Sequence, residues 1–426
     1  MLPIYKSGME MNNHIDVLVI GGGIIGTACA YYLMKEGRRV RIIEQNEFSE
    51  GASNGNCGLI VTSHLLPLCV PGAIRKEIKR TVNRTSPLYV KPSLDFDRLR
   101  WFLNFARKCN PEHLVRAIRA RERILHHSDL LYESLFRKEK IECEWEKKGI
   151  LMVYKTEAEM EKYTQTNAYL KPYGLDAIPY VGDALLSLEP ALRQDVFGAW
   201  YHPIESHLRP EALLREWLKI LVRAGAVIQE SCRLINFVVE GDRVTKVVTT
   251  KGEFNADQYV LATGAWTPQI ARQLNLKVPI QAGKGYSITM ARPSICPGIP
   301  CYFYEKSVVA TPWKSGYRLG GTMEFSGFNT TIVPERLQNL KNVAREYLQD
   351  PVGEPVLEEW VGMRPMTYDD MPVIDWAHRH RNLVVATGHG MTGISMAPST
   401  GKLVAEIITG RTPHLDPAPF SIQRFQ

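Results

Sequence analysis

The chain has 426 residues, a hydrophobic content of 45%, 26 prolines and a formal net charge of +7. This length exceeds that of a usual single hydrophobic core, so two domains are expected, and the composition excludes a disordered or fibrous chain. The eight cysteines are dispersed without a CxxC pair, which argues against a disulfide framework or zinc ribbon and predicts reduced, mostly buried thiols.

The N-terminal region is considered first for targeting and membrane insertion. Residues 1–13 contain one lysine and lack an apolar core, so they do not have the features of a signal peptide. Residues 17–34 form a run of 18 uncharged residues, which reaches the length of a membrane span. Glycines at its centre would weaken such a helix, so the run is interpreted as a strand, a glycine turn and a helix.

Residues 15–44 carry the pattern of an adenine-dinucleotide-binding unit. A β-branched run at 15–20 predicts a buried parallel strand, and it leads directly into a GxGxxG turn at 21–26. A helix is expected at 27–35 and a second strand at 40–43, after which Glu44 supplies an acidic side chain. The alternative is a glycine-rich turn without a ligand, but the strand, helix and acid in register favour dinucleotide binding.

Each part of this unit has an expected role. Gly21 makes the tight turn, Gly23 lets the backbone approach a pyrophosphate, and Gly26 lets helix and strand pack closely. The N-terminus of the helix offers unpaired N–H groups to the phosphates. Glu44 is expected to accept hydrogen bonds from ribose hydroxyls and to disfavour a 2′-phosphate. The neighbouring predicted cofactor contacts are Ile24, Ile25 and Gln45.

The positive charge is concentrated in one segment. Residues 75–123 hold 14 lysines and arginines against five acids, with leucines and aromatic residues interleaved. Such a stretch can rest on anionic lipid headgroups, and the alternative is a solvated helical face whose aromatic side chains fill the core. No recognised nucleic-acid-binding module accompanies the charge, so nucleic acid is not expected as a partner.

A second glycine turn lies near the C-terminus. A strand is expected at 382–387, a second GxGxxG match follows at 388–393, and a helix is expected at 395–408. No strand with a terminal acid follows, so this is not a second complete dinucleotide-binding unit. The turn is expected to direct backbone N–H groups at another part of the same cofactor. A flavin ring fits, because its reduction places negative charge near N1 and O2. The contacts predicted in this turn are Gly390, Met391, Thr392 and Gly393.

The sequence between the two turns predicts two domains. A helix at 210–222 and strands at 226–228 and 258–266 have the patterns of further pieces of the dinucleotide-binding domain. Other regions show helices and period-2 strand patterns, which predict an antiparallel sheet covered by helices. The expected cofactor-binding domain comprises 1–90, 205–277 and 352–426, and the expected substrate domain comprises 91–204 and 278–351.

Several motifs together resemble one group of flavoenzymes. They are the N-terminal unit, Gly-Ala-Ser-Asn-Gly-Asn-Cys-Gly at 51–58, Ala-Thr-Gly-Ala-Trp at 262–266, Gly-Met-Arg-Pro-Met-Thr at 362–367 and the 388–393 turn. The chain thereby resembles the D-amino-acid oxidase superfamily, which includes glycine oxidase and sarcosine oxidase. Residues 284–289 and 320–325 look most similar to the small subunits of bacterial D-amino-acid dehydrogenases. The chain departs from that pattern at Cys57 and at the apolar Met391, which leaves a hydroxyproline-type imino acid or another secondary amine open as substrate.

The resemblance implies an α/β FAD-binding Rossmann-like domain of the glutathione-reductase type beside an α+β substrate domain with an antiparallel sheet. It also implies hydride transfer from the substrate carbon that bears nitrogen to flavin N5, so positioning and charge balance matter more than a strong base. Arg364 is predicted to bind the substrate carboxylate, because a guanidinium matches a carboxylate with two parallel hydrogen bonds. The alternative for Arg364 is a structural salt bridge inside the flavin domain.

Other residues receive roles by the same resemblance, each beside a structural alternative. Tyr286 is predicted to contact the substrate or wall its pocket, unless it only fills a strand, and His389 is predicted to lie beside the flavin. Ser53 and Asn56 are expected to contact phosphate or the ring edge, unless they only shape a turn. Lys284 and Glu324 could serve the flavin and the substrate amine, but an exposed lysine and a surface salt bridge are the favoured readings. The remaining predicted cofactor contacts are Gly58, Thr263 and Gly264.

The expected activity is therefore the oxidation of a D-amino acid or imino acid by a flavoprotein dehydrogenase, with electrons passed to a quinone or another carrier. The alternatives are an oxygen-using oxidase of the glycine, sarcosine or hydroxyproline type and a flavoprotein subunit that is inactive without its partner. FAD is expected to be bound non-covalently, and no metal-binding motif is present. The expected location is cytoplasmic, with peripheral contact of residues 75–123 with the membrane as an option. Both a homo-oligomer and a hetero-oligomer are compatible with the sequence.

Overall fold

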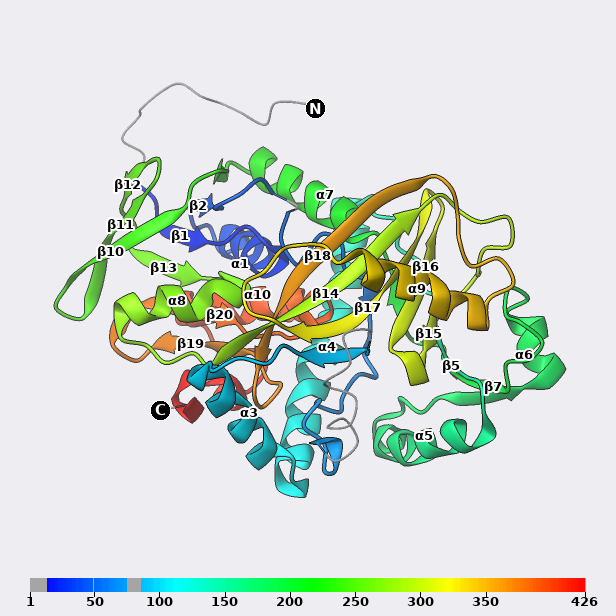
Figure 1. Cartoon of the computed structure of the whole chain (residues 1–426). Helices are drawn as coiled ribbons and strands as arrows, with labels where there is room; N and C mark the ends of the chain where they lie inside the picture. Colours follow the sequence, from blue (N-terminus) through cyan, green and yellow to red (C-terminus); the bar gives the residue numbers. More distant parts are fainter. Residues whose placement is uncertain (1–13, 49, 75–85, 426) are drawn as a thin grey trace.

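The computed structural model describes residues 14–48, 50–74 and 86–425. In these residues the chain folds around one sheet of six strands and another of nine (Figure 1). Two small sheets complete the strands described there. The predicted fold class, a Rossmann-like α/β unit beside a largely antiparallel sheet, is confirmed.

The six-stranded sheet has the order β19-β20-β13-β1-β2-β9. Its members are β1 (Val17–Ile20), β2 (Val40–Ile43), β9 (Val227–Gln229), β13 (Gln258–Leu261), β19 (Val373–Ala377) and β20 (His380–Thr387). Neighbouring strands are parallel except β19 and β20, which are antiparallel. Only β13 separates β1 from β20, so the strands that precede the two glycine turns lie close together in one sheet.

Side chains of β1 alternate between two cores, as its buried position in the sheet requires. Val17 and Val19 face a layer of helices, whereas Leu18 and Ile20 face the opposite side. The helices of the first core are α1 (Ile24–Lys35), α4 (Pro111–Glu139), α7 (Pro210–Arg223) and α10 (Gly393–Thr409). The opposite side carries an antiparallel sheet of β10 (Leu234–Glu240), β11 (Arg243–Thr249) and β12 (Gly252–Phe254), with α8 (Thr267–Ala271) nearby.

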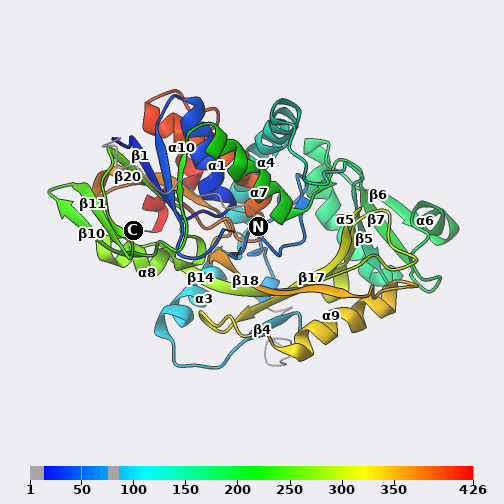
Figure 2. The same ribbon diagram turned by 90° about the horizontal axis from the view of Figure 1, so that it is seen from above.

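The nine-stranded sheet runs β18-β14-β17-β16-β15-β5-β7-β6, with β4 paired to β17. The strands are β4 (Leu88–Val90), β5 (Ile150–Tyr154), β6 (Ile178–Val181), β7 (Gly198–His202), β14 (Ile280–Met290), β15 (Cys301–Phe303), β16 (Val308–Trp313), β17 (Gly316–Phe325) and β18 (Val356–Thr367). The associated helices are α3 (Phe96–Lys108), α5 (Glu157–Leu170), α6 (Gly182–Leu188) and α9 (Pro334–Tyr347). Figure 2 shows α9 on the side of this sheet away from α1 and α10.

Short elements connect these layers. The small sheet of β3 (Leu59–Ile60) and β8 (Ser206–His207) joins the loop after residue 58 to the segment before α7. The 3-10 turns are Lys171–Tyr173, Gly264–Trp266, Arg272–Leu274, Tyr304–Lys306, Ala418–Phe420 and Ile422–Phe425.

Two elements pack differently from the predicted division of the chain. β18, which that division put with the cofactor-binding pieces, pairs with β14 along its length in the nine-stranded sheet. α4, which was put with the substrate pieces, shares the core of α1 and α10 through Leu114, Ile118 and Tyr132. Each of these long elements packs with the other group of pieces, so the position of an element in the sequence does not decide the domain in which it packs.

The structure agrees with the predictions for residues 17–34 and for the cysteines. Residues 17–34 form β1, a turn and most of α1, as predicted. In the described part of the chain, no helix combines the length and the apolar character that crossing a membrane requires. The prediction for residues 1–13 lies outside the described residues. All eight cysteines are free and five of them are buried, which confirms that prediction.

Candidate active site

A cavity of about 2100 Å³ lies between the two large sheets and is lined by residues of both. This volume is larger than the roughly 300–1,000 Å³ of a usual small-molecule pocket, so it suits a long ligand together with a second molecule. All predicted site residues except Gly26 line it. The structure therefore brings together side chains from both ends of the chain and from the nine-stranded sheet.

The first glycine turn has the conformation that was predicted. Gly21 has a φ of +108°, and a Cβ there would collide with the carbonyl oxygen of Ala262 on the neighbouring strand. A Cβ on Gly26 would collide with the carbonyl oxygen of Gly21, which explains why Gly26 packs without lining the cavity. The hydroxyl oxygen of Ser53 accepts a hydrogen bond from the N–H of Ile24 at 2.9 Å, so Ser53 lies at the N-terminus of α1. This is where a pyrophosphate is expected.

Glu44 closes the same end of the cavity. Its carboxylate accepts hydrogen bonds from the N–H of Gly22 at 2.7 Å and from that of Asn46 at 3.2 Å. Burial raises the pKa of Glu44, while these N–H groups act in the opposite direction. A carboxylate held by backbone donors keeps acceptor lone pairs for ribose hydroxyls, and Gln45 lines the cavity beside it.

The amide of Asn56 makes its hydrogen bonds inside the loop 51–58, which is the alternative given for this residue. Asn56 donates to the carbonyl of Ser53 at 3.1 Å and accepts from the N–H of Gly58 at 2.9 Å, so its amide shapes the turn. Gly58 has a φ of +66° and lies against the backbone of Leu208, where a Cβ would collide. The contact predicted for Asn56 with phosphate or the ring edge therefore does not use its amide, because its hydrogen bonds are made inside the loop.

The nine-stranded sheet holds this loop through side chains that the sequence did not single out. Buried Arg318 donates to the carbonyl of Asn56 at 2.8 Å and to that of Asn54 at 3.3 Å. The hydroxyl of Ser287 donates to the carbonyl of Gly55 at 2.7 Å. These partners are more than two hundred positions apart in the chain, and no local pattern in the sequence indicates them.

The C-terminal turn presents backbone to the cavity. Gly388 and Gly390 have positive φ values of +79° and +55°, which glycine adopts without strain. The N–H of Thr392 donates to the carbonyl of His389 at 3.0 Å, so this N–H is used inside the turn and is not free for a flavin oxygen as predicted. Gly393 begins α10, and the N–H groups of its first turn remain the expected donors.

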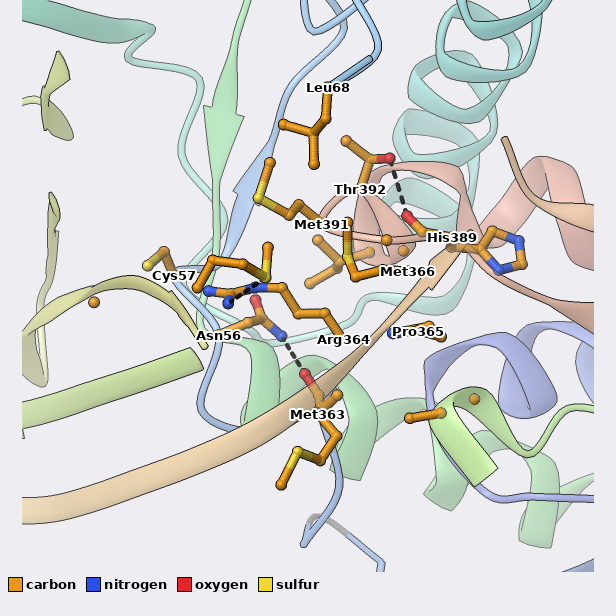
Figure 3. Close-up of a pocket in the computed structure, with 18 of the residues that line it drawn as sticks. Asn56, Cys57, Leu68, Met363, Arg364, Pro365, Met366, His389, Met391 and Thr392 are labelled. Carbon is orange, nitrogen blue, oxygen red and sulfur yellow. Dashed lines mark hydrogen bonds between the residues drawn. The ribbon is translucent and has the colours of Figure 1, made fainter. Parts of the chain in front are cut away.

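The imidazole of His389 does not face the cavity. Its Nε2 lies 2.9 Å from the hydroxyl of Thr400 within α10, and Figure 3 shows the ring pointing away from Arg364. Burial lowers the pKa of His389 to about 3, so the ring is neutral at physiological pH. The atoms of His389 that line the cavity are therefore not those of the imidazole ring, although His389 was predicted to lie beside the flavin.

Thr263 and Gly264 follow β13 and also line the cavity. Gly264 has a φ of +53°, and its carbonyl accepts from the hydroxyl of Thr387 at 3.1 Å. This bond ties the turn after β13 to the end of β20, immediately before the C-terminal glycine turn.

Arg364 extends from β18 into the cavity. Its Nη1 donates to the carbonyl of Thr322 at 2.8 Å, and a Cβ on Gly285 would lie 2.5 Å from its guanidinium carbon, so the guanidinium lies flat over that glycine. Figure 3 shows Arg364 reaching toward Cys57. Among the described residues Arg364 has no carboxylate partner, so the structural salt bridge given as its alternative is not formed there. Burial lowers its pKa, which means that a carboxylate ligand would stabilise the buried cation.

Tyr286 belongs to a buried charged cluster behind Arg364. Its hydroxyl donates to Glu324 at 2.9 Å, and the other oxygen of Glu324 lies 4.0 Å from Lys284. Arg336 pairs with Glu324 at 2.9 Å. The hydroxyl proton of Tyr286 is therefore used by Glu324, and Tyr286 contributes a wall to the cavity rather than a donor.

The structure contradicts the alternatives favoured for Lys284 and Glu324, which were an exposed lysine and a surface salt bridge. Lys284 is fully buried inside β14 rather than exposed at a strand start, and Glu324 forms a buried ion pair rather than a surface one. Lys284 and Glu324 lie opposite each other on the paired strands β14 and β17, so each charge lowers the free-energy cost of burying the other.

The residues described include one group with the spacing of a metal site, although no metal was predicted. It consists of His14, Asp16 and Asp257, of which His14 and Asp257 are exposed. Arg39 already pairs with Asp16 at 2.8 Å. The group lies outside the residues that line the cavity.

The fold and the cavity define a flavin- or nicotinamide-type dinucleotide-binding oxidoreductase in which a second sheet also lines the cavity. The cradle fits FAD, because bare glycines, a helix N-terminus and Glu44 form one end while a second helix N-terminus faces the other. A family model described as FAD dependent oxidoreductase matches residues 16–407. The chain belongs to this family, known as DAO, and FAD is its cofactor.

Relatives and solved structures resemble the chain over almost its full length. A protein named D-amino acid dehydrogenase from Granulibacter bethesdensis is 28% identical over 415 residues, which cover 96% of this chain and 99% of that one. One of the same name from Chromohalobacter salexigens is 28% identical over 424 residues, covering 96% and 100%. The structure of glycine oxidase from Geobacillus kaustophilus has a TM-score of 0.77 at 22% identity, over 96% of this chain and 99% of that one. The likeness to this solved structure shows the fold that the two chains share.

Proposed function

We propose that this FAD-dependent oxidoreductase oxidises the C–N bond of a D-amino acid or imino acid. The observation that carries the proposal is Arg364, a half-buried guanidinium in the cavity that has no carboxylate partner among the described residues. A substrate carboxylate would supply that missing partner through two parallel hydrogen bonds. The curated relatives named D-amino acid dehydrogenase support the same substrate class.

The chain's residues are proposed to act by placement rather than by strong base catalysis. Bound FAD supplies the acceptor for a hydride at N5. Arg364 would orient the carbon that bears nitrogen, and the proton lost from the amine passes to solvent. The product is an imine, which water hydrolyses to a 2-oxo acid and ammonia, or a cyclic imine when the substrate is an imino acid. The first turn of α10 would stabilise negative charge on the reduced cofactor.

Anaerobic titration of the flavin-loaded protein tests this proposal. Bleaching of the yellow absorbance band is expected with D-amino acids or D-imino acids and not with their L-enantiomers. The panel also contains glycine, sarcosine and hydroxyprolines, which represent the amine oxidase alternative. If none of these compounds bleaches the band, the proposed activity is wrong, and a subunit that needs a partner becomes the better reading. Acid precipitation that releases FAD into solution would support non-covalent binding.

We propose a quinone or another carrier as the electron acceptor, with oxygen as the alternative. The dehydrogenase names of the curated relatives favour a carrier, whereas the likeness in fold to glycine oxidase favours oxygen. Peroxide release and reduction of a quinone analogue should be followed in the same preparation. Peroxide formed as fast as substrate disappears would refute the dehydrogenase assignment.

A peripheral contact with anionic membranes is proposed for α3. Three side chains on one face of the helix are strongly exposed, Phe96 at 80%, Leu99 at 57% and Leu103 at 55%. Arg100 and Arg107 on the same helix are exposed cations. Trp101 on the opposite face is buried with Phe325 and Met366, so these aromatic side chains fill the core as the alternative described, whereas the exposed apolar face is left for the membrane. Residues 75–85 of the predicted basic segment lie outside the described residues.

Co-sedimentation with vesicles tests the membrane contact. Binding to vesicles containing phosphatidylserine should exceed binding to neutral vesicles and should fall with added salt. A variant with Phe96→Ser should bind less without loss of flavin, because Phe96 is exposed and does not line the cavity. Binding that does not depend on anionic lipid would contradict the proposal.

A further inference from the structure

Two glycines of β14, Gly283 and Gly285, leave space without side chains beside Arg364, the arginine proposed to bind the substrate carboxylate. A Cβ on Gly285 would overlap the guanidinium of Arg364, and a Cβ on Gly283 would lie 2.5 Å from the sulfur of Met323 and 2.9 Å from Cγ of Met366. Residues two apart on a strand face the same side and are about 6.6 Å apart. The cation and the two thioether side chains therefore lie next to each other over one strand.

Further apolar side chains extend this surface. Leu68 and Met391 line the same cavity, and Figure 3 shows them grouped with Met366 on one side of Arg364. The methyl end of Met366 approaches within 3.6 Å of the position of a Cβ on Gly390, which joins the surface to the C-terminal turn. We call Leu68, Met323, Met366 and Met391 the apolar wall.

Aromatic rings support the apolar wall from behind. Trp101 and Phe325 form a buried cluster with Met366, and Leu68 and Met323 pack against it. The indole N–H of Trp101 donates to the carbonyl of Met366 at 3.0 Å, which fixes the ring. A ligand group that enters against this wall meets sulfur, methyl and methylene groups.

The charged groups near the wall are already compensated. Asp370 lines the cavity next to Gly390, but its carboxylate accepts from the N–H of Leu68 at 2.9 Å and pairs with buried Arg121 at 3.3 Å. Glu324 is paired with Arg336. Among the described residues, a charged substrate side chain against this wall would lose its water without gaining a partner that is not already paired.

We propose that the apolar wall binds the substrate side chain, and that the enzyme prefers D-amino acids with large apolar side chains. The inference rests on the proposed function and adds a substrate class to it. With the carboxylate on Arg364, the side chain of the same small molecule reaches the thioethers of Met323 and Met366. Methionine side chains adapt their shape to unlike partners, so both unbranched and aromatic side chains are accepted.

Steady-state kinetics with a quinone analogue or dye as acceptor test the preference. The substrates are D-methionine, D-leucine and D-phenylalanine, compared with D-alanine, D-aspartate and D-lysine. We expect kcat/KM for the first three to exceed that for D-alanine by at least about tenfold, since each buried methylene contributes to discrimination. D-Aspartate and D-lysine should be the poorest.

Substitutions in the wall should flatten this order. Met323→Ala should lower kcat/KM for D-methionine about tenfold more than it lowers kcat/KM for D-alanine, and the nearly isosteric Met323→Gln should act in the same direction. Met34→Ala is the matched control, because Met34 is a half-buried methionine of α1 outside the cavity. It should leave the order unchanged.

The outcomes separate this inference from the proposed function. Flavin bleaching by D-amino acids in which D-alanine, D-aspartate or D-lysine is best would overturn the side-chain preference and leave the activity standing. Equal losses for all substrates in Met323→Ala would also overturn it. If no amino or imino acid bleaches the flavin, the proposed function itself fails. The wild-type panel decides the question even if a variant does not fold.

Discussion

Replacing Arg364 by alanine removes a guanidinium that has no carboxylate partner among the described residues, so the change leaves no orphaned acid behind. Flavin binding and the yellow colour should persist. Truncating one partner of a buried, hydrogen-bonded charge pair costs about 2–5 kcal/mol. That range corresponds to a loss of kcat/KM between about 30-fold and several thousand-fold. Arg364→Lys keeps the charge but not the planar fork, and it should fall between alanine and the wild type.

The assay is anaerobic stopped-flow reduction of the flavin at increasing substrate concentration. It separates the substrate dissociation constant from the rate of hydride transfer, and the dissociation constant should rise most. Arg345→Ala is a suitable control, because Arg345 lies on α9 and pairs only with the exposed side chain of Asn342 in the structure. Equal reduction kinetics for the wild type and Arg364→Ala would refute the assignment of Arg364.

Three further predictions concern the scaffold. Gly26→Ala should yield a colourless or unfolded protein, because its Cβ collides with the carbonyl of Gly21, whereas Gly51→Ala, with open space around it, should keep the flavin absorbance. Burial raises the pKa of Glu205 to about 7, so the stability tied to its protonated form is complete below its usual 4.5 and is lost as the pH rises through 7. Glu205→Gln should abolish a loss of about 3 kcal/mol in unfolding free energy between pH 5 and pH 8, and an unchanged pH profile in chemical denaturation would contradict this origin. Glu324→Gln should destabilise the fold by about 3–5 kcal/mol, because it leaves two buried cations without their acid, and a change in unfolding free energy below about 1 kcal/mol would count against that cluster.

The elements around both glycine turns could be predicted because their signals are local. Strand, turn and helix follow one another within 30 residues at each end, and the structure has β1 with α1 and β20 with α10 at those places. Arg364 was also found by a local feature, since a charged residue stands between glycine, methionine and proline in a motif.

The parts that could not be predicted depend on contacts between distant segments. Arg318 holds the loop 51–58 from more than 250 positions away, and the pairing of Met323 with Met366 over Gly283 exists only once β14, β17 and β18 are aligned. Lys284 was misjudged for the same reason, because its burial is compensated by Glu324 on the neighbouring strand. Polar side chains such as Asn56 carry no sign in the sequence of whether they face a ligand or their own backbone.

The position of α10 has a consequence for how the protein acquires its cofactor. This helix ends at Thr409 and packs against α1, which begins at Ile24, so the cavity is bounded by two helices that lie far apart in the described chain. A nascent chain emerges from its N-terminus, and the first glycine turn leaves the ribosome long before the second exists. Complete binding of FAD therefore needs both glycine turns, and a chain truncated before α10 would lack the C-terminal part of the binding surface.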